Sequence, residues 1–280
     1  MSGRARFGPG FLVAAAFIGP GTVTTASLAG ARYGFALAWA VLAAIAATLI
    51  LQEMSARLGA VGRVGLGEAI RTGIANPVGR FLATGLALLG ITFGNAAYQA
   101  GNLTGAALGL EALAGGPRAA WVIACALGAA ALLMSGAYRL VEFALIALVA
   151  VMSVVFVTTA IYLGPDLLQL VEAVSQPRIP AGAGLVVLAL IGTTVVPYNL
   201  FMHAAAVREK WRDAPYRDAL VWARRDSLTA VLVGGVVTLA ILTTAVPLFI
   251  AGVGVQGVDE LARQLEPLLG RHARWLFAAG

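Results

Sequence analysis

Seven long intervals without a charged side chain constrain this chain more than any other feature of its 280 residues. Each interval runs for 20 residues or more without Asp, Glu, Lys or Arg, and an α-helix needs about 20 residues to cross the hydrocarbon core of a bilayer. The intervals cover residues 7–31, 33–52, 81–110, 119–138, 143–165, 179–207 and 227–258. They are continuously apolar, whereas the strands of a membrane barrel alternate in polarity. The sequence therefore predicts an all-α, polytopic membrane protein with seven full spans.

The composition excludes a water-soluble fold. Only 11% of the residues are charged and 60% are hydrophobic, whereas soluble domains carry about 25% charged residues. The same apolar content excludes intrinsic disorder. The net charge of +6 does not indicate a nucleic-acid partner, because the basic residues do not alternate with aromatic ones in a stripe. The expected partner is the lipid bilayer.

The charged segments between the spans predict the orientation. With the N-terminus in the cytoplasm, thirteen of the 19 Lys and Arg residues lie on the cytoplasmic side, as the positive-inside rule expects. We therefore predict a multi-pass protein of the plasma membrane with a cytoplasmic N-terminus. The last apolar run, residues 275–280, is typical of the start of an eighth span, so the sequence is expected to be truncated at its C-terminus. The oligomeric state is left open.

Two of the spans contain breaks near their centres. The first carries Gly19-Pro20-Gly21, and the sixth carries Pro197. Proline removes a backbone donor and blocks the preceding helical turn, while glycine permits non-helical dihedral angles. Broken helices at corresponding positions of two repeats indicate an inverted-repeat transporter. We expect one transporter domain over residues 1–280, with a first five-helix repeat at about 7–165 and an incomplete second one at about 179–280. The alternative is two unrelated proline kinks in a structural bundle.

Polar side chains follow both breaks. Thr22 comes after the first, and Asn199 and His203 come after the second. Asn199 and His203 are four residues apart, so they share one helix face. Amide and backbone carbonyl oxygens suit hard cations, and histidine can carry a proton near neutral pH. For His203 an ordinary interhelical hydrogen bond is an equally good reading, and threonines often bond only to their own helix.

The third span carries a polar stripe. Asn95, Tyr98, Gln99 and Asn102 have the i, i+3, i+4, i+7 spacing of one helix face. Polar groups inside a membrane rarely face lipid, so we expect this face to line the bundle interior or an aqueous path. Hydrogen bonding between helices explains the stripe almost as well. At the end of the second span, Glu53 and Arg57 have the spacing of an ion pair within one helix.

Enzyme chemistry is not expected. The chain has two histidines and shows neither a nucleophile spaced from a base nor a glycine-rich nucleotide loop after a strand. We therefore predict a protein that is not an enzyme and has no resident cofactor.

Three segments resemble the Nramp family of metal transporters: Ile18-Gly19-Pro20-Gly21-Thr22-Val23, Leu51-Gln52-Glu53-Met54-Ser55-Ala56-Arg57-Leu58-Gly59 and Val196-Pro197-Tyr198-Asn199-Leu200-Phe201-Met202-His203. The matches are collinear, and the span pattern agrees over the whole chain. The resemblance implies a leucine-transporter-like inverted-repeat fold and metal uptake, usually of manganese or iron, driven by protons. It places the metal, as transported substrate, at carbonyls near Ala16 and Thr193 and at Gly19, Thr22, Val196 and Asn199.

The chain departs from the family at the residues that usually bind metal. Gly19 and Thr22 stand where the family has Asp and Asn, and Val196 stands where it has Met. Tyr198 replaces a histidine, and the acidic pair of the third span falls on Asn95 and Tyr98. A dehydrated divalent cation without a carboxylate partner is costly at mid-membrane. The sequence thus predicts a divergent member of the family that has an altered substrate or moves an ion that keeps more of its hydration shell.

The leading hypothesis is a secondary transporter that moves manganese, iron or magnesium by alternating access. The candidate proton path comprises Tyr198, His203, Asn95, Tyr98 and Gln99. One alternative is a transporter of the same fold for a small organic solute, and another is a sensor that does not transport.

Overall fold

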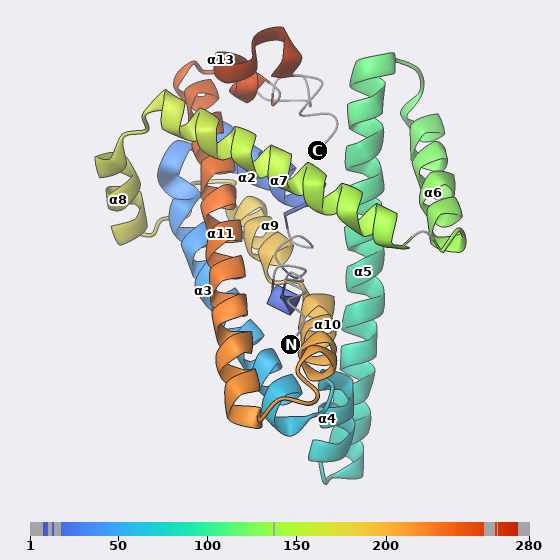
Figure 1. The fold of residues 1–280 in the computed structure, drawn as a ribbon. Coiled ribbons are helices and arrows are strands. Elements are labelled where there is room, and N and C mark those ends of the chain that lie inside the picture. The colour runs from blue at the N-terminus through green and yellow to red at the C-terminus, as the bar shows by residue number, and fades with distance from the viewer. Residues whose placement is uncertain are drawn as a thin grey trace. The chain divides into compact units, whose positions relative to one another are not determined.

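The structure, a computed structural model, describes residues 8–10, 13, 18–136, 138–254, 261 and 263–273 (Figure 1). These residues contain helices and loops and no strand, which confirms the predicted all-α class. The chain clusters into two compact units. Unit 1 comprises Met1–Phe17, Ala44–Tyr98 and Thr194–Gly234, and unit 2 comprises Ile18–Ala43, Gln99–Thr193 and Gly235–Gly280. Each unit takes segments from both predicted repeats, so the repeat boundaries stay a prediction.

Most of the described chain is helical. The longer helices are α2 (Pro20–Tyr33), α3 (Ala38–Arg57), α4 (Leu66–Gly73), α5 (Pro77–Ala114), α6 (Arg118–Met134), α7 (Tyr138–Leu163), α8 (Leu167–Ser175), α9 (Gly184–Thr194), α10 (Pro197–Lys210) and α11 (Tyr216–Ile250). The short ones are the 3₁₀ turn η1 (Gly34–Leu37), the π-helical turn η2 (Leu58–Gly62), η3 (Arg263–Leu265), α13 (Glu266–Leu269) and η4 (Gly270–His272).

Within the described residues, five helical stretches are long and apolar enough to cross a membrane: Pro20–Gly62, Pro77–Glu111, Ile146–Leu163, Gly184–Lys210 and Tyr216–Ile250. The first of these, 43 residues long, includes most of the first two predicted spans, because η1 joins α2 to α3. The fourth predicted span corresponds to α6, which has 17 residues. The number seven therefore stays a prediction, whereas several helices of sufficient length and apolar content are present.

In unit 2, helix α2 packs against α11 at a glycine. A Cβ atom on Gly30 would overlap the carbonyl oxygen of Leu242 and lie 2.9 Å from Cβ of Ala245. Small residues allow helix backbones to approach in this way. A buried polar group joins the same helices to η3: the side-chain amide of Gln264 donates to Ser27 Oγ at 2.8 Å and accepts from Thr244 Oγ1 at 3.1 Å. Ser27, Thr244 and Gln264 are all buried, so this contact satisfies polar groups that would otherwise be unpaired.

In unit 1, small side chains form the core where α3 and η2 meet α10 and α11. The fully buried members of this cluster are Ala56, Ala60, Val207, Ala219 and Ala223. A Cβ atom on Gly59 would overlap the carbonyl oxygen of Ala204. One turn earlier, Ser55 Oγ donates to the carbonyl oxygen of Leu200. Helix α10 is thus held closely along its length.

Arg63 closes the C-terminal end of α10. It follows η2 in the left-handed conformation, with φ 56° and ψ 25°, which costs a residue other than glycine about 1 kcal/mol. In return its guanidinium donates to the carbonyl oxygens of Trp211 at 2.7 Å, Arg212 at 2.9 Å and Ala214 at 2.6 Å. These carbonyls lie just past the helix end, where intrahelical donors are missing. Arg63 therefore fixes the connection between α10 and α11 to η2.

We expect Arg63→Ala to lower the free energy of unfolding by about 2–3 kcal/mol, because three hydrogen bonds to a charged donor are lost. Arg63→Lys should recover only part of this, since an ammonium group cannot form the planar fork that reaches several carbonyls. Thermal unfolding of the purified protein in detergent measures both. Equal midpoints for the Lys variant and the unsubstituted protein would contradict the role of the fork.

Candidate functional site

The first predicted break lies where α2 begins. Residues 18 and 19 form a bend, and Pro20 occupies the first helical position. Gly19 is the N-cap residue, with φ −133° and ψ −176°, and no side chain caps this end. The first helical hydrogen bond joins Val23 N to Gly19 O at 3.0 Å. A Cβ atom on Gly19 would meet no atom of the described residues within 4 Å.

The second break repeats this arrangement. Helix α9 ends at Thr194, and α10 begins at Pro197 after the extended N-cap residue Val196, with φ −98° and ψ 118° and again no side-chain cap. Both half-helices thus begin with proline, whose missing N–H is not needed at the first position. Asn199 N donates to Val196 O at 3.1 Å. Each break leaves a helix N-terminus with its partial positive charge and no capping side chain.

Unit 2 brings residues of the two breaks together. A Cβ atom on Gly21, in the first turn of α2, would lie 3.7 Å from Cγ2 of Thr193, in the last turn of α9. Pro20 Cβ lies 3.1 Å from the Cβ position of Gly105 on α5. The N-terminus of one helix, which favours negative charge, thus lies beside the C-terminus of another, which favours positive charge. Such a pair of helix ends offers both donors and acceptors to a ligand.

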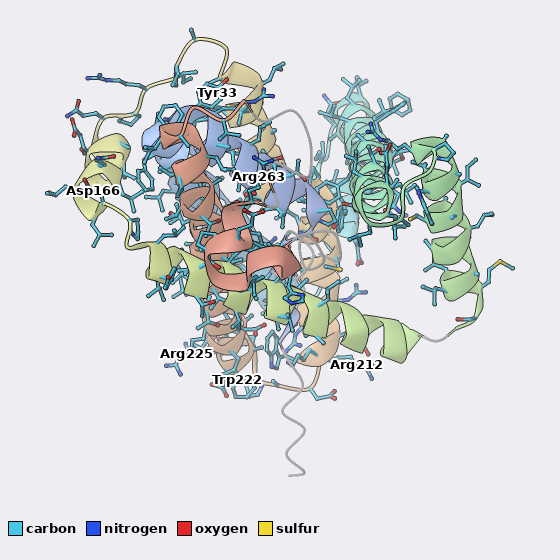
Figure 2. All side chains as sticks on the ribbon, turned by 90° about the horizontal axis from the view of Figure 1, so that it is seen from above. Tyr33, Asp166, Arg212, Trp222, Arg225 and Arg263 are labelled. Atoms are coloured by element: carbon cyan, nitrogen blue, oxygen red, sulfur yellow. The ribbon has the colours of Figure 1, made fainter. Side chains whose placement is uncertain are left out.

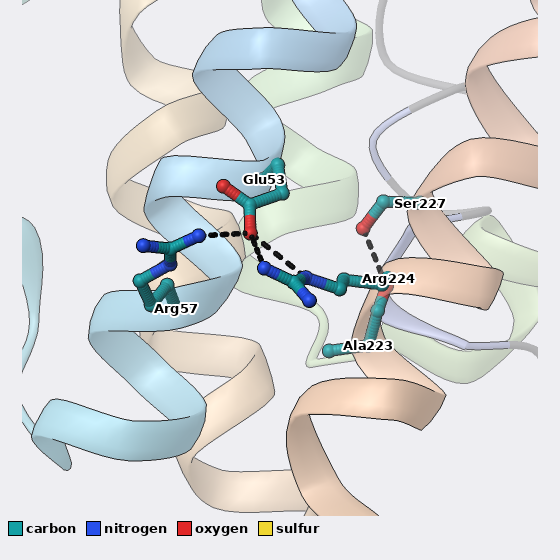
Figure 3. A network of polar contacts seen from close by, with 5 residues as sticks. All are labelled: Glu53, Arg57, Ala223, Arg224 and Ser227. Atoms are coloured by element: carbon teal, nitrogen blue, oxygen red, sulfur yellow. Dashed lines mark hydrogen bonds and ion pairs between the residues drawn. The ribbon is translucent and has the colours of Figure 1, made fainter. Parts of the chain in front are cut away.

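In unit 1, α10 carries two buried polar side chains, Asn199 and His203. Asn199 is 1% exposed, and neither its Oδ1 nor its Nδ2 has a hydrogen-bond partner among the described residues. His203 is fully buried, and its Nε2 lies 3.2 Å from Ser227 Oγ. The Ser227 hydroxyl donates to the carbonyl oxygen of Ala223 at 2.7 Å (Figure 3). The imidazole tautomer determines which of His203 and Ser227 donates in this contact.

The other predicted site residues are distributed as follows. Thr22 and Val196 are buried. The Tyr198 and Tyr98 rings pack edge to face, with centroids 6.2 Å apart and planes at 80°. Asn95 and Gln99 are exposed on α5, and Ala16 lies outside the described residues. In the part of the chain that the structure describes, no group of three or more His, Cys, Asp or Glu side chains is arranged to hold a metal ion. The donors at the breaks are therefore neutral.

The structure adds polar residues that the sequence analysis did not select for the site. Gln52 on α3 is 3% exposed, and its Oε1 has no hydrogen-bond partner. Thr48 Oγ1 lies 3.5 Å from the carbonyl oxygen of Thr194 at the end of α9. Ser227 is the partner of His203. Gln52 could have been found as the one amide in an otherwise apolar interval, whereas the two hydroxyl contacts depend on helix packing.

The predicted ion pair of α3 is present and has a third member. Glu53 Oε1 lies 2.9 Å from an Arg57 guanidinium nitrogen and accepts from Arg224 Nε on α11 at 2.8 Å (Figure 3). Glu53 is thus shared by two arginines from helices that meet in unit 1. This contact joins α3 to α11 and does not involve the helix breaks.

Comparison with known proteins gives a consistent picture. A family model described as "Natural resistance-associated macrophage protein-like" (Nramp) matches residues 10–280. The divalent metal cation transporter MntH of Bacillus subtilis (strain 168) is 29% identical over 283 residues, which cover 98% of this chain and 65% of that protein. MntH of Brucella suis biovar 1 (strain 1330) is 32% identical over 278 residues, which cover 94% of this chain and 59% of that protein. The chain therefore spans roughly three fifths of these relatives' length.

A solved structure shares the fold. The crystal structure of a mutant manganese transporter from Eremococcus coleocola matches with a TM-score of 0.69 at 22% identity, covering 100% of this chain and 64% of that chain. The same transporter in complex with an aromatic bis-isothiourea compound matches with a TM-score of 0.65. At this identity the likeness shows the fold alone, and it agrees with the predicted leucine-transporter-like architecture.

Proposed function

Because this chain belongs to the Nramp family, we propose that it functions in transport of a divalent metal cation across the plasma membrane, with its N-terminus in the cytoplasm. The relatives MntH of Bacillus subtilis and Brucella suis are divalent metal cation transporters. In this proposal the metal is the substrate, and the repeats over residues 7–165 and 179–280 alternate access to it.

The observation that carries the proposal is the pair of interrupted helices. Non-helical backbone at membrane depth is tolerated only where it faces protein, water or a ligand, because unpaired polar groups in hydrocarbon cost several kcal/mol. The ends at Gly19 and Val196 have no capping side chain. Asn199 follows the second end within one turn and is buried with an unpaired carbonyl oxygen. A partly hydrated cation would satisfy such groups.

The chemistry of the donors favours a hard cation that keeps part of its water shell. By their residue types, the predicted substrate-binding residues Gly19, Thr22, Thr193, Val196 and Asn199 offer backbone or neutral oxygen atoms, and none of them offers a carboxylate or a thioether. Oxygen ligands suit magnesium and manganese, and magnesium usually retains several waters when bound to protein. We therefore propose that manganese, iron and magnesium are the substrates to test, with little preference for softer metals.

Proton coupling would depend on His203 in this proposal. It is the one residue of the candidate path with an imidazole, and its Nε2 lies 3.2 Å from Ser227 Oγ. Tyr198 and Tyr98 pack together at the start of α10. Asn95 and Gln99 cannot carry a charge, so they would serve by holding water.

Uptake into proteoliposomes tests the transport proposal. We expect uptake of Mn²⁺ or Mg²⁺ into vesicles that contain the protein, and a drop of at least about tenfold for Asn199→Leu because an oxygen ligand is lost. The same variant should keep or raise its thermal unfolding midpoint, since it replaces an unpaired buried polar group by an apolar one. Gln169→Leu, which removes an exposed amide on α8, is the matched control and should transport normally. Absence of uptake of every divalent cation tested would refute metal transport.

A further inference from the structure

We propose that one end of unit 1 binds the headgroups of anionic phospholipids. This surface, the basic end, comprises residues 57–80 and 208–225. These ranges contain the last residue of α3, η2, α4, the first turn of α5, the last turn of α10, the connection from α10 to α11 and the first turns of α11. It contains ten Arg and Lys residues against four Asp and Glu residues. The proposal concerns a lipid partner and does not depend on which ion the protein transports.

The net charge of the chain is concentrated there. The sequence of unit 2 contains seven basic and seven acidic residues, so it is neutral, whereas the sequence of unit 1 carries the whole surplus of +6. All the basic residues of unit 1 apart from Arg4 and Arg6 lie in the basic end. An asymmetry of this size creates an attractive potential for anions over one surface.

Contacts among its elements hold the basic end together. Arg63 donates to carbonyl oxygens of Trp211 and Ala214 in the connection to α11. An Arg208 guanidinium nitrogen lies 3.2 Å from a carboxylate oxygen of Glu68, which ties α10 to α4. These interactions pair Arg63 and Arg208 with acceptors on neighbouring elements of the basic end.

The outer arginines have no such neutralisation. Arg71, Arg217 and Arg225 are exposed, and no carboxylate in the described part of the chain lies within 4 Å of their guanidinium groups. Arg212 has Asp213 at 3.9 Å, but both side chains are largely exposed, at 71% and 97%, so the pair is weak. The side chains of Arg212 and Arg225 extend outward from the ribbon (Figure 2). Unpaired, exposed guanidinium groups are suited to phosphate.

Exposed aromatic side chains favour a lipid over a soluble partner. Tyr216 and Trp222, on the first turns of α11, are 54% and 47% exposed. Tyrosine and tryptophan prefer the headgroup level of a bilayer. The charge-free part of α11 begins at Ser227, two residues after Arg225. Arg225 and Trp222 are therefore placed where a helix leaves hydrocarbon and meets lipid phosphates, and basic clusters in this position attract anionic lipids.

The test measures lipid binding by the purified full chain in neutral detergent. Phosphatidylglycerol or phosphatidylcholine is added, and bound lipid is counted by native mass spectrometry while thermal unfolding is followed. We expect phosphatidylglycerol to bind and to raise the midpoint, with an affinity about tenfold lower for the variant Arg212→Gln/Arg217→Gln/Arg225→Gln. Salt at about 0.5 M should weaken binding, because it screens exposed charges. Soluble glycerophosphate should give no shift.

Arg178→Gln is the matched control, because Arg178 is an exposed arginine of unit 2 whose guanidinium bonds to Gln176. It should bind phosphatidylglycerol as the unsubstituted protein does. Because the triple variant changes only exposed residues, its thermal unfolding midpoint without lipid should be unchanged. If that midpoint falls, the single variant Arg225→Gln provides an independent measurement of lipid affinity. The proposal would be overturned if phosphatidylglycerol and phosphatidylcholine bound equally. It would also be overturned if glycerophosphate shifted the unfolding midpoint as much as phosphatidylglycerol does, or if the triple variant bound phosphatidylglycerol with unchanged affinity. The measurement needs no transported metal, so its outcome is separate from that of the uptake experiment.

Discussion

Gly19→Asp should increase the affinity for Mn²⁺ by about tenfold or more, because it adds a charged oxygen ligand at the first helix break. The backbone of Gly19 is extended, with φ −133°, and an added Cβ would meet nothing within 4 Å. Aspartate is also favoured as an N-cap residue, where its carboxylate accepts from the first free amides of the helix. The side chain can therefore be accommodated without moving the backbone. The concentration dependence of Mn²⁺ uptake, with and without competing Mg²⁺, measures the effect.

Gly65→Asp is the control for this prediction. Gly65 is the N-cap residue of α4, with extended backbone and open space around its Cβ position, so the substitution adds the same cap and charge away from the breaks. It should leave Mn²⁺ uptake unchanged. If both variants alter uptake equally, or if Gly19→Asp weakens it while the protein stays folded, the cation does not bind at this helix end.

Gly30→Ala should destabilise the protein by about 3 kcal/mol, because overpacking of a well-packed contact costs this much. The added Cβ would overlap the Leu242 carbonyl oxygen and crowd Ala245, and a backbone atom cannot rotate away as a flexible side chain can. Separation of α2 from α11 would also disturb Ser27 and its hydrogen bond with Gln264. The thermal unfolding midpoint and the yield of monodisperse protein report the loss.

Gly90→Ala provides the comparison. Gly90 lies in the middle of α5, where a Cβ would meet nothing within 4 Å, so alanine should be neutral or raise stability by about 0.5–1 kcal/mol through its higher helix propensity. A Gly30→Ala protein as stable as Gly90→Ala would mean that α2 and α11 do not pack at Gly30.

The helices were predictable where the chain is continuously apolar, and their ends were not. Helix α11 begins at Tyr216, eleven residues before its charge-free interval, because a helix continues into the headgroup region where charges are solvated. Helix α8 was not predicted. It lies between two apolar intervals and begins at Leu167 after the N-cap residue Asp166. The Asp166 carboxylate accepts from the amides of Leu168 and Gln169, and such a capping residue is not visible in the pattern of charge-free intervals.

The candidate site was predictable as far as local spacing determines it. Proline positions indicated both helix starts, and the four-residue spacing put Asn199 and His203 on one face of α10. The contact from His203 to Ser227 joins α10 to α11, and that from Ser27 to Gln264 joins residues 237 positions apart. Neither follows from a periodic pattern, because each depends on which helices pack together.

The closely held α10 also determines how this part of the protein can move. Leu200 and Ala204 contact Ser55 and Gly59, and the residues after the helix are bound by Arg63. Because of these contacts, we expect α10 to move together with the end of α3 and η2. We expect bending to occur most easily at residues 195–196, which lie between α9 and α10 and are not helical.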